Sequence, residues 1–177
     1  WYRSRGLGDV YKRQRSITNP LGALKFINQG ANSSTYLMQA TDTDSPYLAA
    51  GQYKSFRGNA GKSKVTIGRY KKNLGNQSHI GIIATNRDYQ VGGSGSLIEF
   101  DSLINFLDDY ILDLNYARSD TQEGNVNFID THETFAGRTY AMDGESFSGT
   151  AKTFRLRRAV DGSNWGIRFK DVSPTYR

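Results

Sequence analysis

The segment 97–119, LIEFDSLINFLDDYILDLNYARS, constrains the fold of this chain more than any other segment. Apolar and polar residues alternate along both of its halves. The apolar series is Ile98, Phe100, Ile104, Phe106, then Tyr110, Leu112, Leu114 and Tyr116. Successive side chains of a strand point to opposite faces of a sheet. The alternation therefore predicts a β-hairpin that turns at 107–109 and has one apolar and one polar face.

The same segment also has a helical interpretation. Apolar residues spaced three and four apart occur at Leu97, Phe100, Ile104, Leu107, Ile111 and Leu114, and Ser96 with Glu99 would form a capping box. A helix would leave five large apolar residues away from its buried stripe: Ile98, Phe106, Tyr110, Leu112 and Tyr116. Strands are favoured because they place these residues on the apolar side.

The rest of the chain extends the strand pattern. Further strands are expected at 23–28, 34–41, 63–72, 78–87, 146–158 and 164–172. Short connections (29–33, 73–77, 107–109, 159–163) alternate with long ones (42–62, 88–96, 120–145). We therefore expect an all-β chain, an antiparallel up-and-down meander of about eight strands. Short turns at one end and long loops at the other are typical of the wall of an outer-membrane type β-barrel.

In such a wall, the apolar face meets lipid and the polar face lines an interior. The expected membrane-facing aromatic residues are Phe106, Tyr110, Tyr116, Trp165 and Phe169, and the expected lumen-facing polar residues are Arg155, Arg157, Arg168, Lys170, Asp113 and Asn115. The alternative is a soluble β-sandwich or small barrel whose apolar faces pack against each other. The strand pattern alone leaves both architectures open.

Four cations form the one constellation with a functional interpretation. Arg155, Arg157, Arg168 and Lys170 recur at two-residue spacing on two strands joined by a tight Asp-Gly turn, so they share a sheet face. One interpretation is a wall that attracts anions or polyols, with Glu99, Asp101 and Asp113 of the central hairpin as counter-charges. The other, which is favoured, is an internal salt-bridge ladder that holds the barrel wall.

Residues 1–14 are interpreted as non-native. The run SRGLGDVYKRQ at 4–14 matches the in-frame translation of a sequencing-library adapter, so the chain is expected to be a metagenomic fragment, 15–177 of a β-barrel domain truncated at the N-terminus and also at the C-terminus. Residues 1–14 carry +3 of the formal net charge of +6, which leaves little reason to expect a nucleic-acid partner.

Motifs for catalysis and cofactors are absent from the sequence. The chain has no cysteine and only two histidines, His79 and His132, which are not at zinc-ligand spacing. The run RGNAGKS at 57–63 has Phe56 where a phosphate loop needs its first glycine. We expect no catalytic residue, cofactor or metal site, and the chain is not expected to be an enzyme. A glycan-processing enzyme is the remaining catalytic alternative, because carboxylates are plentiful.

Two runs carry a resemblance to a known family. The pattern G-N-x-S…G-x-x-x-T-N-R spans 75–87, and aromatic-x-D-x-S-P-x-aromatic-R spans 169–177. With the strand LIEFDSLINF, they make residues 22–177 resemble the barrel region of bacterial proteins in which a carbohydrate-binding family 9-like domain precedes a C-terminal domain of unknown function. The resemblance implies an outer-membrane β-barrel of a Gram-negative bacterium and supports strands in 97–119. It supplies no catalytic residues.

The expected function follows from these points. The chain is interpreted as part of an outer-membrane barrel that binds or passes a carbohydrate or another polar solute. Its expected partners are outer-membrane lipid, a carbohydrate ligand, and the N-terminal glycan-binding domain of the same protein, which is absent from this chain. The alternative is a soluble, lectin-like all-β module whose ligand site is formed by the loops 42–62 and 120–145.

Overall fold

The computed structural model describes residues 17–50, 55–125, 132–135, 137–139 and 141–176. Residues 1–14, interpreted above as adapter-derived, lie outside this part of the chain. The structure assigns β-strands and no helix within the described residues, which confirms the all-β prediction. No helix in the described part is long and apolar enough to cross a membrane.

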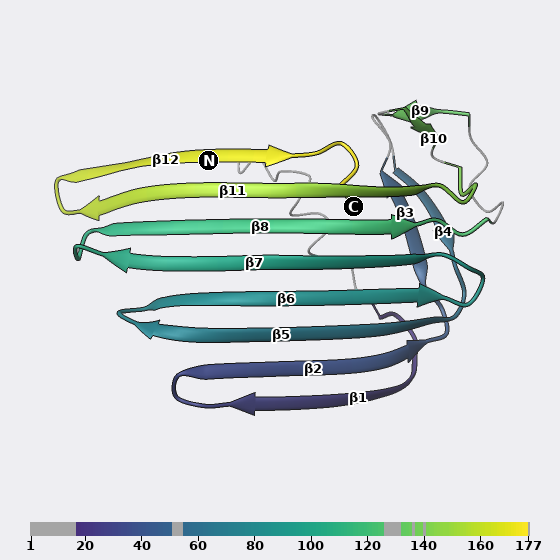
Figure 1. Ribbon diagram of the computed structural model, residues 1–177, viewed down its shortest axis with the longest axis horizontal. Helices are drawn as coiled ribbons and strands as arrows, with labels where there is room; N and C mark the ends of the chain where they lie inside the picture. Colours follow the sequence, from purple (N-terminus) through teal and green to yellow (C-terminus); the bar gives the residue numbers. More distant parts are fainter. Residues whose placement is uncertain (1–16, 51–54, 126–131, 136, 140, 177) are drawn as a thin grey trace.

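Eight strands form one antiparallel sheet (Figure 1). In sheet order, which is also chain order, they are β1 (Pro20–Gln29), β2 (Ser33–Asp42), β5 (Ser63–Gly75), β6 (Ser78–Tyr89), β7 (Ser94–Phe106), β8 (Tyr110–Gln122), β11 (Ser146–Val160) and β12 (Ser163–Val172). Each strand pairs with its sequence neighbour in the sheet, so the up-and-down meander is confirmed. The sheet is open, with β1 and β12 as its outer strands.

The connections divide between the two ends of the sheet. The turns β1–β2, β5–β6, β7–β8 and β11–β12 lie at one end, on the left in Figure 1, and the other three connections lie at the opposite end. Two of these three are long, but the prediction of a long connection at 88–96 is wrong, because β6 runs to Tyr89 and β7 begins at Ser94, which leaves a short turn at 90–93. The connection 43–62 contains a hairpin of β3 (Pro46–Ala50) and β4 (Ser55–Asn59). The connection 123–145 contains β9 (Thr134–Phe135) and β10 (Arg138–Thr139). These regions were expected to be loops, and their strands are too short for a two-residue period to stand out.

The segment 97–119 forms β7 and β8, so the strand prediction is confirmed. Phe106 pairs with Tyr110 at the turn, and the ladder continues to Ser94 opposite Gln122. β7 also pairs with β6, and β8 with β11, so both strands have a hydrogen-bonded neighbour on each side. β8 runs three residues beyond the expected end at 119 because β11 begins at Ser146 and pairs with that extension.

The strand register separates the side chains into two faces. One cross-strand row joins Tyr70, Ile82, Phe100 and Tyr116, and a parallel row joins Ile104, Leu112, Leu156 and Ile167. We call the face that holds these rows the apolar face. The other face, here the polar face, holds the rows Arg69–Ile83–Glu99–Ala117 and His79–Leu103–Asp113–Arg155–Arg168.

Buried apolar side chains gather on the polar face near the long connections. Ala40, Val65, Ala117 and Phe147 are each less than a tenth exposed, and all four have the register of that face. By contrast, the apolar face exposes large side chains on every strand: Leu24, Phe26, Leu37, Tyr70, Ile82, Ile98, Phe100, Phe106, Tyr116, Phe154, Trp165, Ile167 and Phe169. The small core therefore lies on the opposite side of the sheet from most of the large apolar residues.

The C-terminal residues contribute to that core by folding back after β12. Ser173 donates its backbone N–H to the carbonyl of Thr150, and the Thr175 hydroxyl donates to the carbonyl of Ser148. A Cβ at Gly149 would overlap the backbone of Tyr176, so only glycine fits beneath this segment. Burial raises the pKa of the Tyr176 phenol, and the negative charge of Glu99 raises it further.

Asp42, the last residue of β2, fixes the segment that precedes β1. Asp42 pairs with Ser63 at the long-connection end of the sheet, and its side chain is fully buried. Its carboxylate accepts hydrogen bonds from the backbone N–H groups of Thr18 (2.9 Å) and Asn19 (2.8 Å). Burial opposes ionisation, but these bonds, a longer one from Asp44 and the charge of Arg87 outweigh it, so the pKa of Asp42 is lowered.

The lowered pKa makes stability depend on pH. Because Asp42 binds a proton more weakly in the folded state, its stabilisation is present above the ordinary Asp pKa and is lost as pH falls through the lower folded value. We expect Asp42→Asn to reduce the free energy of unfolding at pH 7 by about 1–3 kcal/mol. Below about pH 4 the difference from wild type should shrink. Denaturant titrations from pH 2.5 to 7 measure this, and a pH-independent difference would contradict it.

Candidate functional site

The six predicted lumen residues all lie on the polar face, on β8, β11 and β12. Arg155 lies directly opposite Asp113 on one side and Arg168 on the other. Thr153 occupies the same position between Asn115 and Lys170. Arg157 lies opposite Gly166, and its side chain occupies the space left by the missing side chain. The Arg157 Cγ is 3.3 Å from the position that a Cβ at residue 166 would take. We call Arg155, Arg157, Arg168 and Lys170 the cationic strip.

The cationic strip is not neutralised by the surrounding described residues. None of its members takes part in an ion pair within the described part of the chain. Arg155 and Arg157 are half-buried, and the Nε of each is buried without a hydrogen-bond partner among the described residues. Asp113, opposite Arg155, instead accepts a 2.7 Å hydrogen bond from the Asn115 amide. The internal salt-bridge ladder that the sequence favoured is therefore not what this structure shows.

The expected counter-charge Asp101 pairs with other residues. Its carboxylate lies 2.9 Å from the Arg69 guanidinium and 3.5 Å from Nε2 of His79. Gly81, the cross-strand neighbour of Asp101, allows this position, because a Cβ there would lie 2.7 Å from the carboxylate. The polar face thus has a compensated region on β5–β7 and a region of excess positive charge on β11–β12.

The five predicted membrane-facing aromatic residues all lie on the apolar face. Phe106 stacks on Tyr110 with ring centroids 5.4 Å apart, and Trp165 meets the edge of Tyr110 at 6.2 Å. This cluster lies next to the short turns, where Arg158 is 3.6 Å from Asp109 and lies over the Tyr110 ring. Tyr116 and Phe169 lie in rows farther from the turns.

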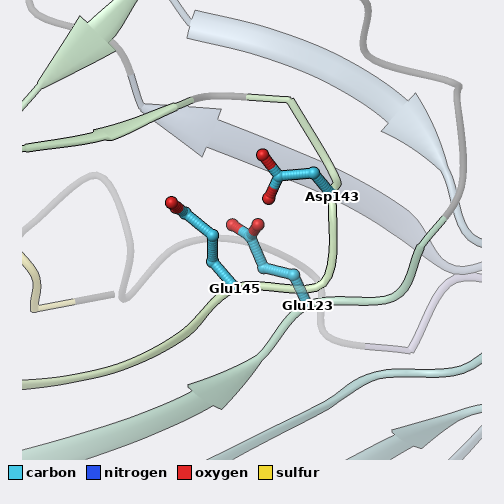
Figure 2. A group of neighbouring side chains, drawn as sticks. All are labelled: Glu123, Asp143 and Glu145. Carbon is cyan, nitrogen blue, oxygen red and sulfur yellow. The ribbon is translucent and has the colours of Figure 1, made fainter.

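Three carboxylates meet at the long-connection end (Figure 2). Glu123 is buried just after β8, and Asp143 and Glu145 precede β11; one carboxylate oxygen from each residue lies within 4.8 Å of the other two. Carboxylates so placed suit a hard cation such as Ca²⁺. Two of the three also contact donors of the protein, since the Thr139 hydroxyl donates to Asp143 (2.8 Å) and Arg138 is 4.0 Å from Glu145.

Sequence reasoning missed this acidic cluster. Glu123 is 20 residues from Asp143, and the whole stretch was interpreted as an irregular loop. The pairing of β8 with β11, the bond from the Glu123 N–H to the Glu145 carbonyl and the bridge between Asn125 and Asp143 bring the two ends together. The spacing of the three carboxylates in the sequence does not by itself indicate that they lie close together. An open surface depression of about 430 Å³ lies next to this region, lined by Ser94, Ser96, Asp120, Thr121, Gln122, Ser146, Phe147 and Ser148.

Comparison with known proteins identified no relative. No family model, no curated protein and no solved structure matches this chain.

The close approach of Asp101 to Gly81 can be tested by adding one methyl group. We expect Gly81→Ala to push the carboxylate away from Arg69 and to lower the free energy of unfolding by about 1–3 kcal/mol. The matched control is Gly95→Ala on β7, where a Cβ meets no atom within 4 Å. Equal effects of the two substitutions in denaturant titrations would show that the Asp101 contact does not matter.

Proposed function

We propose that this chain forms part of the wall of an outer-membrane β-barrel in a Gram-negative bacterium, and that it binds or passes a polar solute without catalysis. The exposed apolar face carries the proposal. Large apolar side chains are exposed on it from β1 to β12, with Ile167 and Phe169 each 59% exposed. Monomeric soluble proteins rarely expose apolar surface continuous over a whole sheet, whereas a barrel in lipid requires it.

The height of the apolar face supports the same proposal. On β7 the apolar series runs from Ile98 to Phe106, which is about 27 Å along the strand and about 20 Å in height at the strand tilt of about 35–45° found in such barrels. An outer-membrane barrel has an apolar band about 25 Å high with aromatic residues at both borders. Phe106, Tyr110 and Trp165 lie at the turn-side border, and the row Tyr70–Ile82–Phe100–Tyr116 lies toward the other.

The polar face supports passage of a polar solute. It carries charged and amide side chains at mid-strand, among them the Asp101–Arg69 pair and the Asn115–Asp113 hydrogen bond. Such groups suit a water-filled interior, where they remain solvated. The choice of a carbohydrate as solute rests on the resemblance of 75–87 and 169–177 to proteins that also carry a glycan-binding domain.

A soluble lectin-like module is the second candidate, favoured by the open surface depression beside the long connection 123–145. Its lining hydroxyls of Ser94, Ser96, Ser146 and Ser148 and the Asp120 carboxylate suit a saccharide. This candidate requires another layer to cover the apolar face. No element in the described part of the chain does so, because the large residues on that face stay exposed. The barrel wall is therefore the better-supported function.

Two neighbouring residues of β7 provide a matched test. Ile104 lies on the apolar face and Leu103 on the polar face, so Ile104→Arg and Leu103→Arg place the same charge on opposite sides of one strand. We expect Ile104→Arg to weaken insertion into lipid bilayers by about 2–4 kcal/mol, and Leu103→Arg to insert nearly as well as wild type. The readouts are partitioning into vesicles and heat-modifiable migration on a gel.

The outcomes separate the two candidate functions. A soluble module would stay out of vesicles as wild type, and Ile104→Arg would leave it folded and would increase its solubility. Equal loss of insertion in both variants would also contradict the proposed faces, because the polar face would then be in contact with lipid as well.

A further inference from the structure

We propose that the cationic strip is a binding site for an oxyanion, carried by an acidic sugar or by a phosphorylated solute. The proposal rests on the proposed function, because it names the class of polar solute that the polar face would bind. It assigns the site to the guanidinium groups of Arg155, Arg157 and Arg168 and the ammonium group of Lys170.

The cationic strip places like charges next to each other. Arg155 and Arg168 lie directly opposite each other on β11 and β12, and Lys170 follows Arg168 on the same face. Opposite residues in an antiparallel pair have Cβ atoms about 5 Å apart, and like charges placed so are destabilising. An anion bound between the two guanidinium groups would turn this repulsion into attraction.

The cationic strip also contains side-chain N–H donors that have no hydrogen-bond partner within the described residues. The Nε atoms of Arg155 and Arg157 are buried, and neither has a hydrogen-bond partner within the described residues. A buried donor without a partner costs free energy that a ligand can recover. A guanidinium presents its N–H groups as a planar fork that fits the two oxygens of a carboxylate or phosphate.

No nearby carboxylate forms an ion pair with the cationic strip within the described residues. Asp113 accepts from the Asn115 amide at 2.7 Å. Asp101 pairs with Arg69 at 2.9 Å, and Asp171, beside Lys170 in sequence, lies 3.9 Å from Lys152. Gly166 has no side chain, and the Arg157 side chain lies over it, with its Cγ 3.3 Å from the position that a Cβ of residue 166 would take. The strip therefore combines positive charge with unpaired donors on one part of the polar face.

The test measures anion binding to the full chain in detergent micelles by calorimetric titration. Inorganic phosphate and glucuronate are the two oxyanion probes, and glucose is the neutral control. Phosphate represents a phosphorylated solute, and glucuronate represents an acidic sugar. We expect phosphate or glucuronate to bind, with weaker affinity at higher salt, and glucose not to bind. No binding of either anion, or equal binding of glucose and glucuronate, would overturn the proposal.

Charge-matched variants locate the site. We expect the double variant Arg155→Gln, Arg168→Gln to weaken binding of the oxyanion probe by about tenfold or more. The control is Lys25→Gln, Lys71→Gln, which removes the same charge from the polar face on β1 and β5 and should change affinity less than about threefold. Equal weakening in both pairs would mean a diffuse field rather than a site, and would overturn the proposal.

A second variant pair keeps the test valid if the glutamines unfold the sheet. Arg155→Lys, Arg168→Lys retains both charges but loses the planar forks, so we expect measurable but weaker binding with unchanged circular dichroism. Unchanged affinity in this pair would overturn the fork geometry. Vesicle insertion of Ile104→Arg and Leu103→Arg is measured separately. Insertion without anion binding would overturn the oxyanion site alone. Anion binding without insertion would overturn the barrel wall alone.

Discussion

Register between neighbouring strands is the constraint on which both faces of this sheet depend. Side chains alternate with a period of two, so a slip of one residue between two strands would move every apolar side chain of one strand to the polar face. The ladder from β5 to β12 keeps residues of like character in the same cross-strand rows, for example Ile104, Leu112, Leu156 and Ile167. Hairpin turns of a few residues hold that register at one end of the sheet.

The two faces set different demands on their surroundings. The polar face has its own small core near the long connections, where the C-terminal residues fold back over Gly149. The apolar face has no such cover within the described residues and exposes large side chains on all eight strands. A lipid environment meets that demand without a further protein layer, and the outer strands β1 and β12 would then pair with other strands, since lipid does not tolerate open edges.

The sequence was sufficient to predict the eight long strands and their order. The two-residue alternation is clearest in 97–119, and a short turn between two strands allows only antiparallel neighbours. It also placed Arg155 and Arg168 on one face, because a tight turn fixes the register of β11 and β12. The small hairpin β3–β4 was not foreseen, because two five-residue strands give too short a pattern.

Side-chain partners were harder to predict than faces. Asp101 and Asp113 were both expected as counter-charges for the cationic strip, but Asp101 lies against Arg69 and His79, across Gly81. Which of several cations on one face a carboxylate pairs with depends on strand separation and side-chain reach, neither of which is in the alternation pattern. The acidic cluster of Glu123, Asp143 and Glu145 was missed for a related reason, since it forms only when β8 and β11 bring distant residues together.

The environment of the two faces can be measured directly along β7. The chain has no cysteine, so single cysteines at each position from 97 to 106 give unique spin-label sites. In lipid bilayers, we expect the even positions 98, 100, 104 and 106 to be accessible to oxygen in the lipid. We expect the odd positions 97, 99, 101, 103 and 105 to be accessible to a water-soluble nickel reagent. Accessibility without this alternation, or protection of the even positions from both reagents, would contradict a sheet with one face in lipid and the other toward water.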